Sequence, residues 1–248
     1  MWTRVASAVR GVKADRMKRF GALANLDGLS LGCYTRSYEM ARIVKADAEG
    51  ALPEAVAVLK GGGLVVYPSD TVYGLAAAAS DERAVERAFV VKGRDAGKAL
   101  SLLLADAADL EPVCAEVPSL ARVLADRYWP GPLTLVLRRS PGFHSAALGG
   151  GDTVAVRVPD HPFLRELIRA LSEPITGTSA NRSGRPACRS AQEVERELGD
   201  AVDLIIDGGP SGEGPESTVV DVTRGLPAIL REGAIPRADV ERLARVAT

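Results

Sequence analysis

Residues 61–75 of the chain read Gly61-Gly62-Gly63-Leu64-Val65-Val66-Tyr67-Pro68-Ser69-Asp70-Thr71-Val72-Tyr73-Gly74-Leu75. Residues 64–67 are apolar after three glycines, a pattern that predicts a buried strand. Pro68 lacks the N–H that a strand ladder needs, so we expect the strand to end there. Three small polar side chains follow at a position where open α/β sheets commonly bind ligands. An ordinary polar turn is the other interpretation.

The composition is that of a soluble globular protein. Hydrophobic residues make up 46% of the 248 positions and charged residues 25%, which suits one large domain or two small ones with a real core. The net charge of −1 excludes electrostatic binding of nucleic acid by the whole molecule, so any basic surface must be local. Aromatic residues are 4% of the chain, which argues against a platform that stacks single-stranded bases.

The cysteines and the apolar runs indicate the compartment. Cys33, Cys114 and Cys188 are odd in number and widely scattered, so they match neither a disulfide framework nor a zinc pattern. No apolar run approaches the roughly 20 residues that a membrane span needs. We therefore predict a cytoplasmic protein without a membrane partner.

Residues 1–39 differ in charge from the rest of the chain. Within the first twenty positions a single acid, Asp15, accompanies six cations: Arg4, Arg10, Lys13, Arg16, Lys18 and Arg19. This composition fits a flexible basic arm that touches RNA and also a transit peptide. A third interpretation is a dispensable leader ahead of an alternative start at Met40, because residues 40–44 predict a first strand. We predict a basic extension over 1–39 and one folded domain over 40–248.

After Met40, helical and extended hydrophobic patterns are interspersed. Helices are predicted over 53–60, 81–92, 118–128, 161–171, 190–198 and 236–246. Strands are predicted over 40–44, 64–67, 100–104, 133–137, 153–158, 174–176, 202–206, 218–222 and 228–230. The predicted fold class is α/β, an open twisted sheet of mixed parallel and antiparallel strands flanked by helices and not a doubly wound Rossmann sheet.

Cations at the end of the 81–92 helix are the first candidate for a binding site. Lys92-Gly93-Arg94, with Lys98 four residues farther on, offers a point charge and a bidentate fork that could clamp a polyphosphate. Cations at a helix C-terminus are also favourable for purely electrostatic reasons. These residues alone leave both interpretations open.

Two polar segments associated with predicted strands are further candidates. In the strand over 153–158, alternation places Arg157 on the same face as Thr153 and Ala155. That arginine could bind a carboxylate or phosphate, or form an edge-strand salt bridge. Small residues in Gly177-Thr178-Ser179-Ala180-Asn181-Arg182-Ser183-Gly184 would let a ligand approach the backbone. This loop has neither the Walker signature nor the GxGxxG fingerprint, so its pattern is weak evidence for a phosphate site.

Seven motifs in order give a resemblance to a known family. They are Pro68-Ser69-Asp70-Thr71-Val72-Tyr73-Gly74-Leu75, Lys92-Gly93-Arg94, Trp129-Pro130-Gly131-Pro132-Leu133-Thr134, Ala155-Val156-Arg157, Ser179-Ala180-Asn181, Ser217-Thr218-Val219-Val220-Asp221 and Arg231-Glu232-Gly233. Over 51–233 the chain resembles the YrdC-like threonylcarbamoyl-AMP synthases, in their short single-domain form. The resemblance implies a YrdC-like catalytic domain over 40–248 with a central concave basic cavity.

The resemblance also implies a reaction. Such a nucleotidyltransferase makes threonylcarbamoyl-AMP and pyrophosphate from L-threonine, bicarbonate or CO2, and ATP, with Mg2+ accompanying the nucleotide and no separate metal site. The product serves tRNA threonylcarbamoyladenosine modification by a downstream transferase complex, and weak tRNA or double-stranded RNA binding is also implied. Motifs rich in Lys, Arg, Ser and Thr fit a reaction that depends on positioning and charge neutralisation.

Individual roles carry over from the same resemblance. The positions assigned to catalysis are Lys92 and Arg94. The positions assigned to L-threonine are Thr71, Arg157, Gly177 and Ser217. The positions assigned to ATP are Arg94, Lys98, Thr153, Ser179, Asn181, Ala187 and Arg231.

Three positions depart from the family pattern. Many members have Asn at Lys98 and His at Leu103, and others have Ser at Ala187. Lys98 can still meet a phosphate, whereas Leu103 cannot donate the hydrogen bond that a histidine would offer to threonine. His144 and His161 match no catalytic position, and we predict them at the surface or at a helix start.

Two other functions stay open at this point. The first is an RNA-binding module of the YciO-like kind, which would use the same basic concavity without catalysis. The second is a nucleotide hydrolase whose ATP breakdown is indifferent to threonine.

Overall fold

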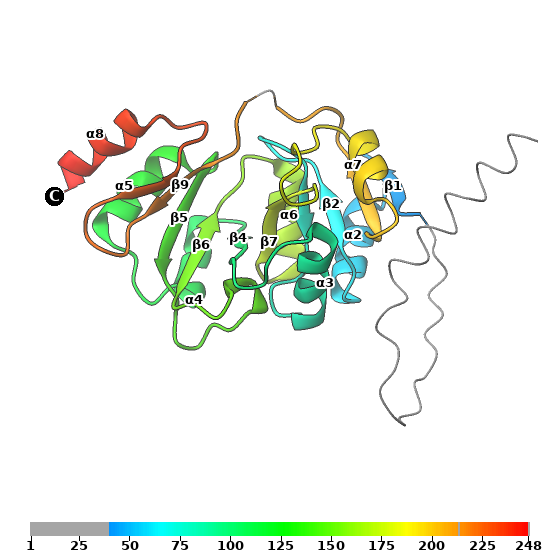
Figure 1. Cartoon of the computed structure of the whole chain (residues 1–248), viewed down its shortest axis with the longest axis horizontal. Coiled ribbons are helices and arrows are strands. Elements are labelled where there is room, and N and C mark those ends of the chain that lie inside the picture. Colours follow the sequence, from blue (N-terminus) through cyan, green and yellow to red (C-terminus); the bar gives the residue numbers. More distant parts are fainter. Residues whose placement is uncertain (1–39, 213, 248) are drawn as a thin grey trace, which may run out of the picture. The chain divides into compact units, whose positions relative to one another are not determined.

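The structure is a computed structural model that describes residues 40–212 and 214–247, so the extension predicted over 1–39 lies outside the described residues. Ten strands of the described part form one sheet in the order β1-β8-β2-β3-β7-β4-β6-β5-β9-β10. Their bounds are β1 Arg42–Lys45, β2 Val65–Tyr67, β3 Gly74–Ala76, β4 Ser101–Leu103, β5 Leu133–Arg138, β6 Thr153–Arg157, β7 Ile175–Ser179, β8 Leu204–Asp207, β9 Thr218–Asp221 and β10 Ala228–Arg231. In Figure 1, β1 (blue) and β9 (orange) lie toward opposite ends of the sheet.

The strand pairing confirms the predicted mixed sheet. Strand β8 pairs in parallel with β1 and β2, and the pairs β4–β6 and β5–β9 are also parallel. The remaining pairs, among them β2–β3, β3–β7 and β5–β6, are antiparallel. Because β1 and β10 are at opposite ends of this order, the sheet is open.

Helices of the described part cover both faces of the sheet. Their bounds are α2 Ala51–Lys60, α3 Glu82–Lys92, α4 Leu110–Val113, α5 Ser119–Tyr128, α6 Pro162–Leu171, α7 Ala191–Leu198 and α8 Arg237–Ala247, with short 3-10 helices η1 Ala107–Asp109 and η2 Ala146–Leu148. None of the helices within residues 40–212 and 214–247 is both long and apolar enough to cross a lipid bilayer.

Two hydrophobic clusters pack on the sheet, one on each of its faces. On one face, apolar side chains of α2 and α6 pack with Val65 of β2 and Ile206 of β8. Val66 of β2 belongs to the larger cluster, which contains buried residues of α3, α5, α7 and α8. Successive strand residues point to opposite faces, so the two clusters share the same strands. The smaller cluster extends to Leu103 of β4.

The 61–75 stretch forms β2 and ends it at Tyr67, directly before Pro68, as predicted. After the polar turn the chain returns antiparallel to β2 as β3, which was not among the predicted strands. Glycine and alanine have low strand propensity, and pairing with strands on both sides overrides it here. Helix α3 is capped by Asp81, whose side chain accepts a hydrogen bond from the Ala84 N–H.

Candidate active site

A cavity of about 510 Å³ lies against the sheet on the same face as α2 and α6. Its floor is made of side chains that alternate along the strands with core residues. Thr134 and Val136 of β5 line the cavity, whereas Leu135 between them lies in the larger core. In β6, Ala155 and Arg157 line it in the same way. The floor therefore crosses several neighbouring strands and is not confined to strand ends.

Two glycines of the floor leave room for a ligand. A Cβ atom on Gly177 would lie 2.7 Å from Cδ2 of Leu103, and one on Gly74 would overlap the ring of Tyr67. Both glycines line the cavity. Larger residues at these positions would push the neighbouring side chains into the space that a ligand needs.

The cavity is basic, as the resemblance implies. Lys92, Arg94, Arg157 and Arg231 line it, and Glu216 is the only acid among its lining residues in the described part of the chain. Several cations in one concave site concentrate positive potential there. This arrangement favours an anionic ligand.

Arg157, the last residue of β6, is fixed by neighbouring groups. Its Nη2 donates to both carboxylate oxygens of Asp70 at 2.6 Å, and its Nε donates to the Gly131 carbonyl at 2.9 Å. Nη1 donates to Thr71 Oγ1 at 3.3 Å. An arginine has five N–H donors, so these four bonds leave one on Nη1 for a ligand. A bidentate hydrogen bond to a ligand carboxylate would require Arg157 to give up one of these partners.

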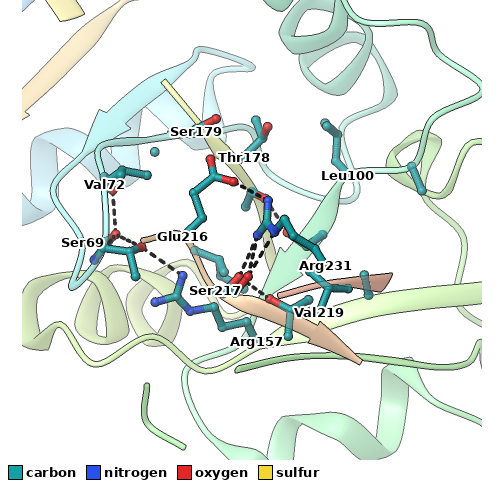
Figure 2. A pocket seen from close by; sticks show the side chains of 18 of the residues that line it. Ser69, Val72, Leu100, Arg157, Thr178, Ser179, Glu216, Ser217, Val219 and Arg231 are labelled. Carbon is teal, nitrogen blue, oxygen red and sulfur yellow. Dashed lines mark hydrogen bonds and ion pairs between the residues drawn. The ribbon is translucent and has the colours of Figure 1, made fainter. Parts of the chain in front are cut away.

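Arg231 lies at the end of β10 and closes another side of the cavity. It forms an ion pair with Glu216, and Nη2 donates to the Ser217 carbonyl at 2.9 Å and to Ser217 Oγ at 3.1 Å. The Ser217 hydroxyl also lies 2.8 Å from Thr134 Oγ1 of β5. Figure 2 shows Glu216 and Ser217 joined to Arg231, with Arg157 approaching the same cavity from another strand.

Lys92 anchors the loop that follows β7. Its Nζ donates to the carbonyl oxygens of Ser179 and Asn181 and, at 3.3 Å, to Asn181 Oδ1. Asn181 in turn donates Nδ2 to the Arg185 carbonyl at 2.6 Å. Burial, with a smaller contribution from the charge of Arg94, lowers the pKa of Lys92 to about 8. Lys92 therefore both positions the loop and places a titratable charge beside the cavity.

Arg94 lies at the rim, just after Gly93 ends α3 in a left-handed conformation. Its Nε and Nη2 donate to the carbonyl oxygens of Lys98 and Ala99, each at 3.0 Å. The guanidinium thus folds onto the following turn. Lys98 itself is exposed and does not line the cavity.

Most of the residues assigned by resemblance meet in this one cavity. Those that line it are Thr71, Lys92, Arg94, Arg157, Gly177, Ser179, Asn181, Ser217 and Arg231. Those that do not are Lys98, Thr153 and Ala187. Thr153 begins β6, two residues before Ala155, which does line the cavity. Thr153 and Ala155 are on the same face of the strand, because side chains two residues apart point the same way. The cavity nevertheless ends at Ala155 and does not reach Thr153.

The structure also shows where Leu103, which replaces the family histidine, and the two histidines lie. Leu103 lines the cavity with an apolar side chain. His144 is exposed, and His161 is the N-cap residue of α6, as predicted for a helix start. His161 is only partly exposed, and its buried Nδ1 has no hydrogen-bond partner among the described residues.

Three residues of the site were missed by sequence reasoning. Asp70 belongs to the quoted turn, but its role as the partner of Arg157 depends on β6, which is distant in the sequence. Glu216 directly precedes a recognised motif, and an acid beside a polar motif was the available signal. Tyr67 reads as the last apolar residue of a strand, and nothing in the pattern shows that it borders a cavity.

Comparison with known proteins shows which proteins the chain is similar to. The Sua5_yciO_yrdC family model, described as "Telomere recombination", matches residues 57–233. The threonylcarbamoyl-AMP synthases of Pyrococcus abyssi and Bacillus subtilis are 44% and 39% identical over 76% and 77% of this chain, which covers 56% and 55% of their lengths. The chain thus spans about half the length of these relatives. It covers 97% of the Vibrio cholerae threonylcarbamoyl-AMP synthase, which is 39% identical over 73% of this chain.

Solved structures give the same picture. Pyrococcus abyssi Sua5 complexed with L-threonine matches with a TM-score of 0.77 and 41% identity, over 83% of this chain and 61% of that one. Escherichia coli YciO matches with a TM-score of 0.71 and 29% identity, over 79% of this chain and 98% of that one. Both likenesses confirm the predicted fold.

Proposed function

The chain belongs to the Sua5/YciO/YrdC family, and from this premise we propose that it is a threonylcarbamoyl-AMP synthase, a nucleotidyltransferase that uses L-threonine, bicarbonate or CO2, and ATP. The observation that carries the proposal is the joint lining of one cavity by Thr71, Arg94, Arg157, Ser179 and Arg231. These residues come from separate segments of the chain. An amino acid and a polyphosphate need just such a mixture of hydroxyl and cationic groups.

In this proposal the amino acid lies over β6 and β9. Arg157 attracts the substrate carboxylate, with Thr71 and Ser217 supplying hydroxyl groups on either side. Asp70 holds the guanidinium in place from the turn after β2. A preformed orientation of this kind lowers the entropic cost of bringing reactants together.

The nucleotide phosphates lie toward Lys92, Arg94 and Arg231. Arg94 and Arg231 now donate to protein acceptors, so the phosphates would take over some of these bonds. The charge on Lys92 adds to the positive potential at the phosphates while its Nζ stays hydrogen-bonded to the loop after β7. Electrostatic stabilisation of the charge that develops on the phosphates is the main catalytic effect that this site can supply.

The proposed chemistry needs no covalent protein intermediate. The threonine amine bonds to the carbon of CO2 and loses a proton, which gives a carbamate. A carbamate oxygen then bonds to the α-phosphorus of ATP, and the bond from that phosphorus to the bridging oxygen of the β-phosphate breaks. Pyrophosphate leaves with the electron pair, and threonylcarbamoyl-AMP is formed.

In this proposal a magnesium ion accompanies the nucleotide. Among the described residues there is no group of three or more His, Cys, Asp or Glu side chains that could hold a metal ion. Mg2+ typically takes one or two carboxylates together with substrate phosphates. Glu216 would supply that carboxylate, and the ion would add charge neutralisation at the phosphates.

The product is an activated carbamoyl adenylate, so its proposed consumer is the complex that transfers the threonylcarbamoyl group to tRNA. Weak binding of tRNA or double-stranded RNA, and action in the cytoplasm, belong to the same proposal. The excess of cations around the cavity supports affinity for a polyanion.

The proposal is tested by pyrophosphate release from the purified chain. We expect release that requires both threonine and bicarbonate and that falls at least about 100-fold in Arg94→Ala, as for the loss of one electrostatic stabiliser. Arg122→Ala is the matched control, because Arg122 is exposed on α5 and does not line the cavity. ATP breakdown that ignores threonine would indicate a hydrolase. Double-stranded RNA binding without threonine-dependent turnover would favour the YciO-like alternative.

A further inference from the structure

The hydroxyl group of Tyr67 borders the cavity without a hydrogen bond to the protein. Tyr67 is 2% exposed and lines the cavity. Within residues 40–212 and 214–247 its Oη makes no hydrogen bond, whereas the hydroxyl of nearby Tyr73 donates to the Gly209 carbonyl at 2.6 Å. The Oη atom is not among the fully enclosed polar atoms that lack a partner in the described part of the chain, so it opens onto the cavity. A ligand that displaces water from this place must pair with the hydroxyl or leave it unpaired, which costs free energy.

The backbone fixes where this hydroxyl lies. Tyr67 is the last residue of β2 and pairs directly with Gly74 of β3. A Cβ atom on Gly74 would overlap Cζ and Oη of Tyr67, so the hydroxyl end of the ring lies over the glycine. Gly74 pairs on its other side with Ser179. Burial raises the pKa of Tyr67, so the group stays a neutral donor and acceptor at physiological pH.

The adjoining part of the cavity wall is apolar. Leu103 lies over Gly177, and both line the cavity together with Tyr67 and Gly74. Tyr67 and Leu103 also belong to the same hydrophobic cluster. Ser101 and Ser179 also adjoin this wall, but Ser101 donates its hydroxyl to the Gly177 carbonyl and Ser179 donates to Asn181 Oδ1. Tyr67 thus supplies the hydroxyl of this wall that has no partner among the described residues. The wall suits a short side chain that carries one hydroxyl and one methyl group.

We propose that Tyr67 Oη forms a hydrogen bond with the side-chain hydroxyl of the amino-acid substrate, while Leu103 contacts its methyl group. This inference rests on the proposed function and names the residue that selects a β-hydroxy amino acid. The substrate carboxylate has Arg157, so the neutral hydroxyl of Tyr67 is left for the neutral end of the ligand. A site built to pair with a substrate hydroxyl discriminates strongly against an analogue that lacks it.

The test is a cycle of two proteins and two ligands, measured by titration calorimetry on the full chain. L-Threonine and L-2-aminobutyrate differ only in the hydroxyl, and Tyr67→Phe removes only the hydroxyl of the protein. We expect Tyr67→Phe to weaken the binding of L-threonine at least about tenfold and that of L-2-aminobutyrate by about twofold or less. The reason is that the hydroxyl of bound L-threonine loses its partner in the variant, whereas L-2-aminobutyrate has no hydroxyl to leave unpaired. An equal loss for both ligands, or no loss for either, overturns the inference.

Tyr73→Phe is the matched control. It makes the same chemical change six residues away, but its hydroxyl is paired within the protein and Tyr73 does not line the cavity. We expect Tyr73→Phe to lower the melting temperature and to keep the ligand preference of the wild type. Tyr67→Phe should keep the melting temperature, because it breaks no internal hydrogen bond. A Tyr67→Phe variant that melts earlier than Tyr73→Phe contradicts the unpaired hydroxyl on which the inference depends.

The two levels of proposal fail separately. A wild-type chain that releases no pyrophosphate with threonine and bicarbonate refutes the synthase activity. A wild-type chain that does so, while Tyr67→Phe retains full preference for L-threonine over L-2-aminobutyrate, refutes only the role of Tyr67.

Discussion

Nη2 of Arg157 lies 2.6 Å from both carboxylate oxygens of Asp70, and this ion pair joins the turn after β2 to the end of β6. The side chains are only 10% and 16% exposed, so solvent screens the pair little. Asp70 is not among the lining residues of the cavity, whereas Arg157 is. The carboxylate therefore acts on the site through the arginine.

Asp70→Asn should lower both stability and threonine affinity. The substitution leaves the charge of Arg157 without its counter-ion, so we expect a loss of about 2 kcal/mol in the free energy of unfolding. Urea denaturation measures this loss, and the KM for threonine should rise. Asp152→Asn is the control, because Asp152 and its partner Arg138 are 76% and 51% exposed. Equal losses in the two variants would show that the buried pair has no special role.

Nucleotide affinity should fall as the pH rises through about 8. The pKa of Lys92 is lowered to about 8, so the lysine is protonated and attracts phosphates below that value and becomes neutral above it. Cys188, whose pKa is raised to about 11 by burial, stays protonated over the same range. Binding of a non-hydrolysable ATP analogue between pH 7 and pH 9.5 measures the effect.

Lys98→Met provides the comparison for this pH dependence. Lys98 is exposed and lies outside the cavity, so the midpoint near pH 8 should persist in that variant. Lys92→Met should bind the analogue more weakly and without the midpoint. A midpoint that survives in Lys92→Met would assign the titration to another group.

Glu216→Gln should strengthen binding of the nucleotide. The change removes the acid that lines the cavity and releases Arg231 from its ion pair. Both partners are partly exposed, so we expect only about a two- to fivefold gain, largest at low salt. Calorimetry with the ATP analogue in the absence of Mg2+ checks this, with Glu111→Gln on α4 as an exposed control outside the cavity. With Mg2+ present the gain should shrink, because the proposed magnesium ligand is gone. Weaker binding of the metal-free analogue in Glu216→Gln would contradict the prediction.

Gly177→Ala should shrink the threonine end of the cavity. The added Cβ would lie 2.7 Å from Cδ2 of Leu103, so the leucine side chain, which also lines the cavity, must shift. We expect a cost of about 1–3 kcal/mol in stability and a raised KM for threonine. Gly142→Ala serves as the control, because no heavy atom lies within 4 Å of its added Cβ. Unchanged kinetics in Gly177→Ala would mean that threonine does not approach this glycine.

Much of the fold could be predicted from local patterns. β2 and its end at Pro68 follow from a short apolar run and a residue without an N–H donor. Alternation correctly placed Ala155 and Arg157 on one face of β6. β3 could not be predicted, because its Gly-Leu-Ala sequence becomes extended only through pairing with β2 and β7.

The site was predicted through ordered motifs more than through physical patterns. Arg94 and Arg157 each had an ordinary structural explanation when considered alone, and a ligand-binding role became apparent only from the cavity that they share with Arg231. The partners of Arg157 and Arg231 required tertiary information, because Asp70 is far from β6 in the sequence and Glu216 far from β10. The role of Tyr67 depends on a bond that is missing, and no sequence pattern reports a missing bond.

The alternation along β5 and β6 separates two tasks at single-residue resolution. A substitution at Val136 or Ala155 alters what the ligand meets, while Leu135 and Val156 continue to hold the layers together. New ligand preferences can thus be acquired one residue at a time with little loss of folding. A deletion of one residue within either strand would do the opposite, because it would exchange the two sets of side chains and cost the protein its interior and its substrate at once.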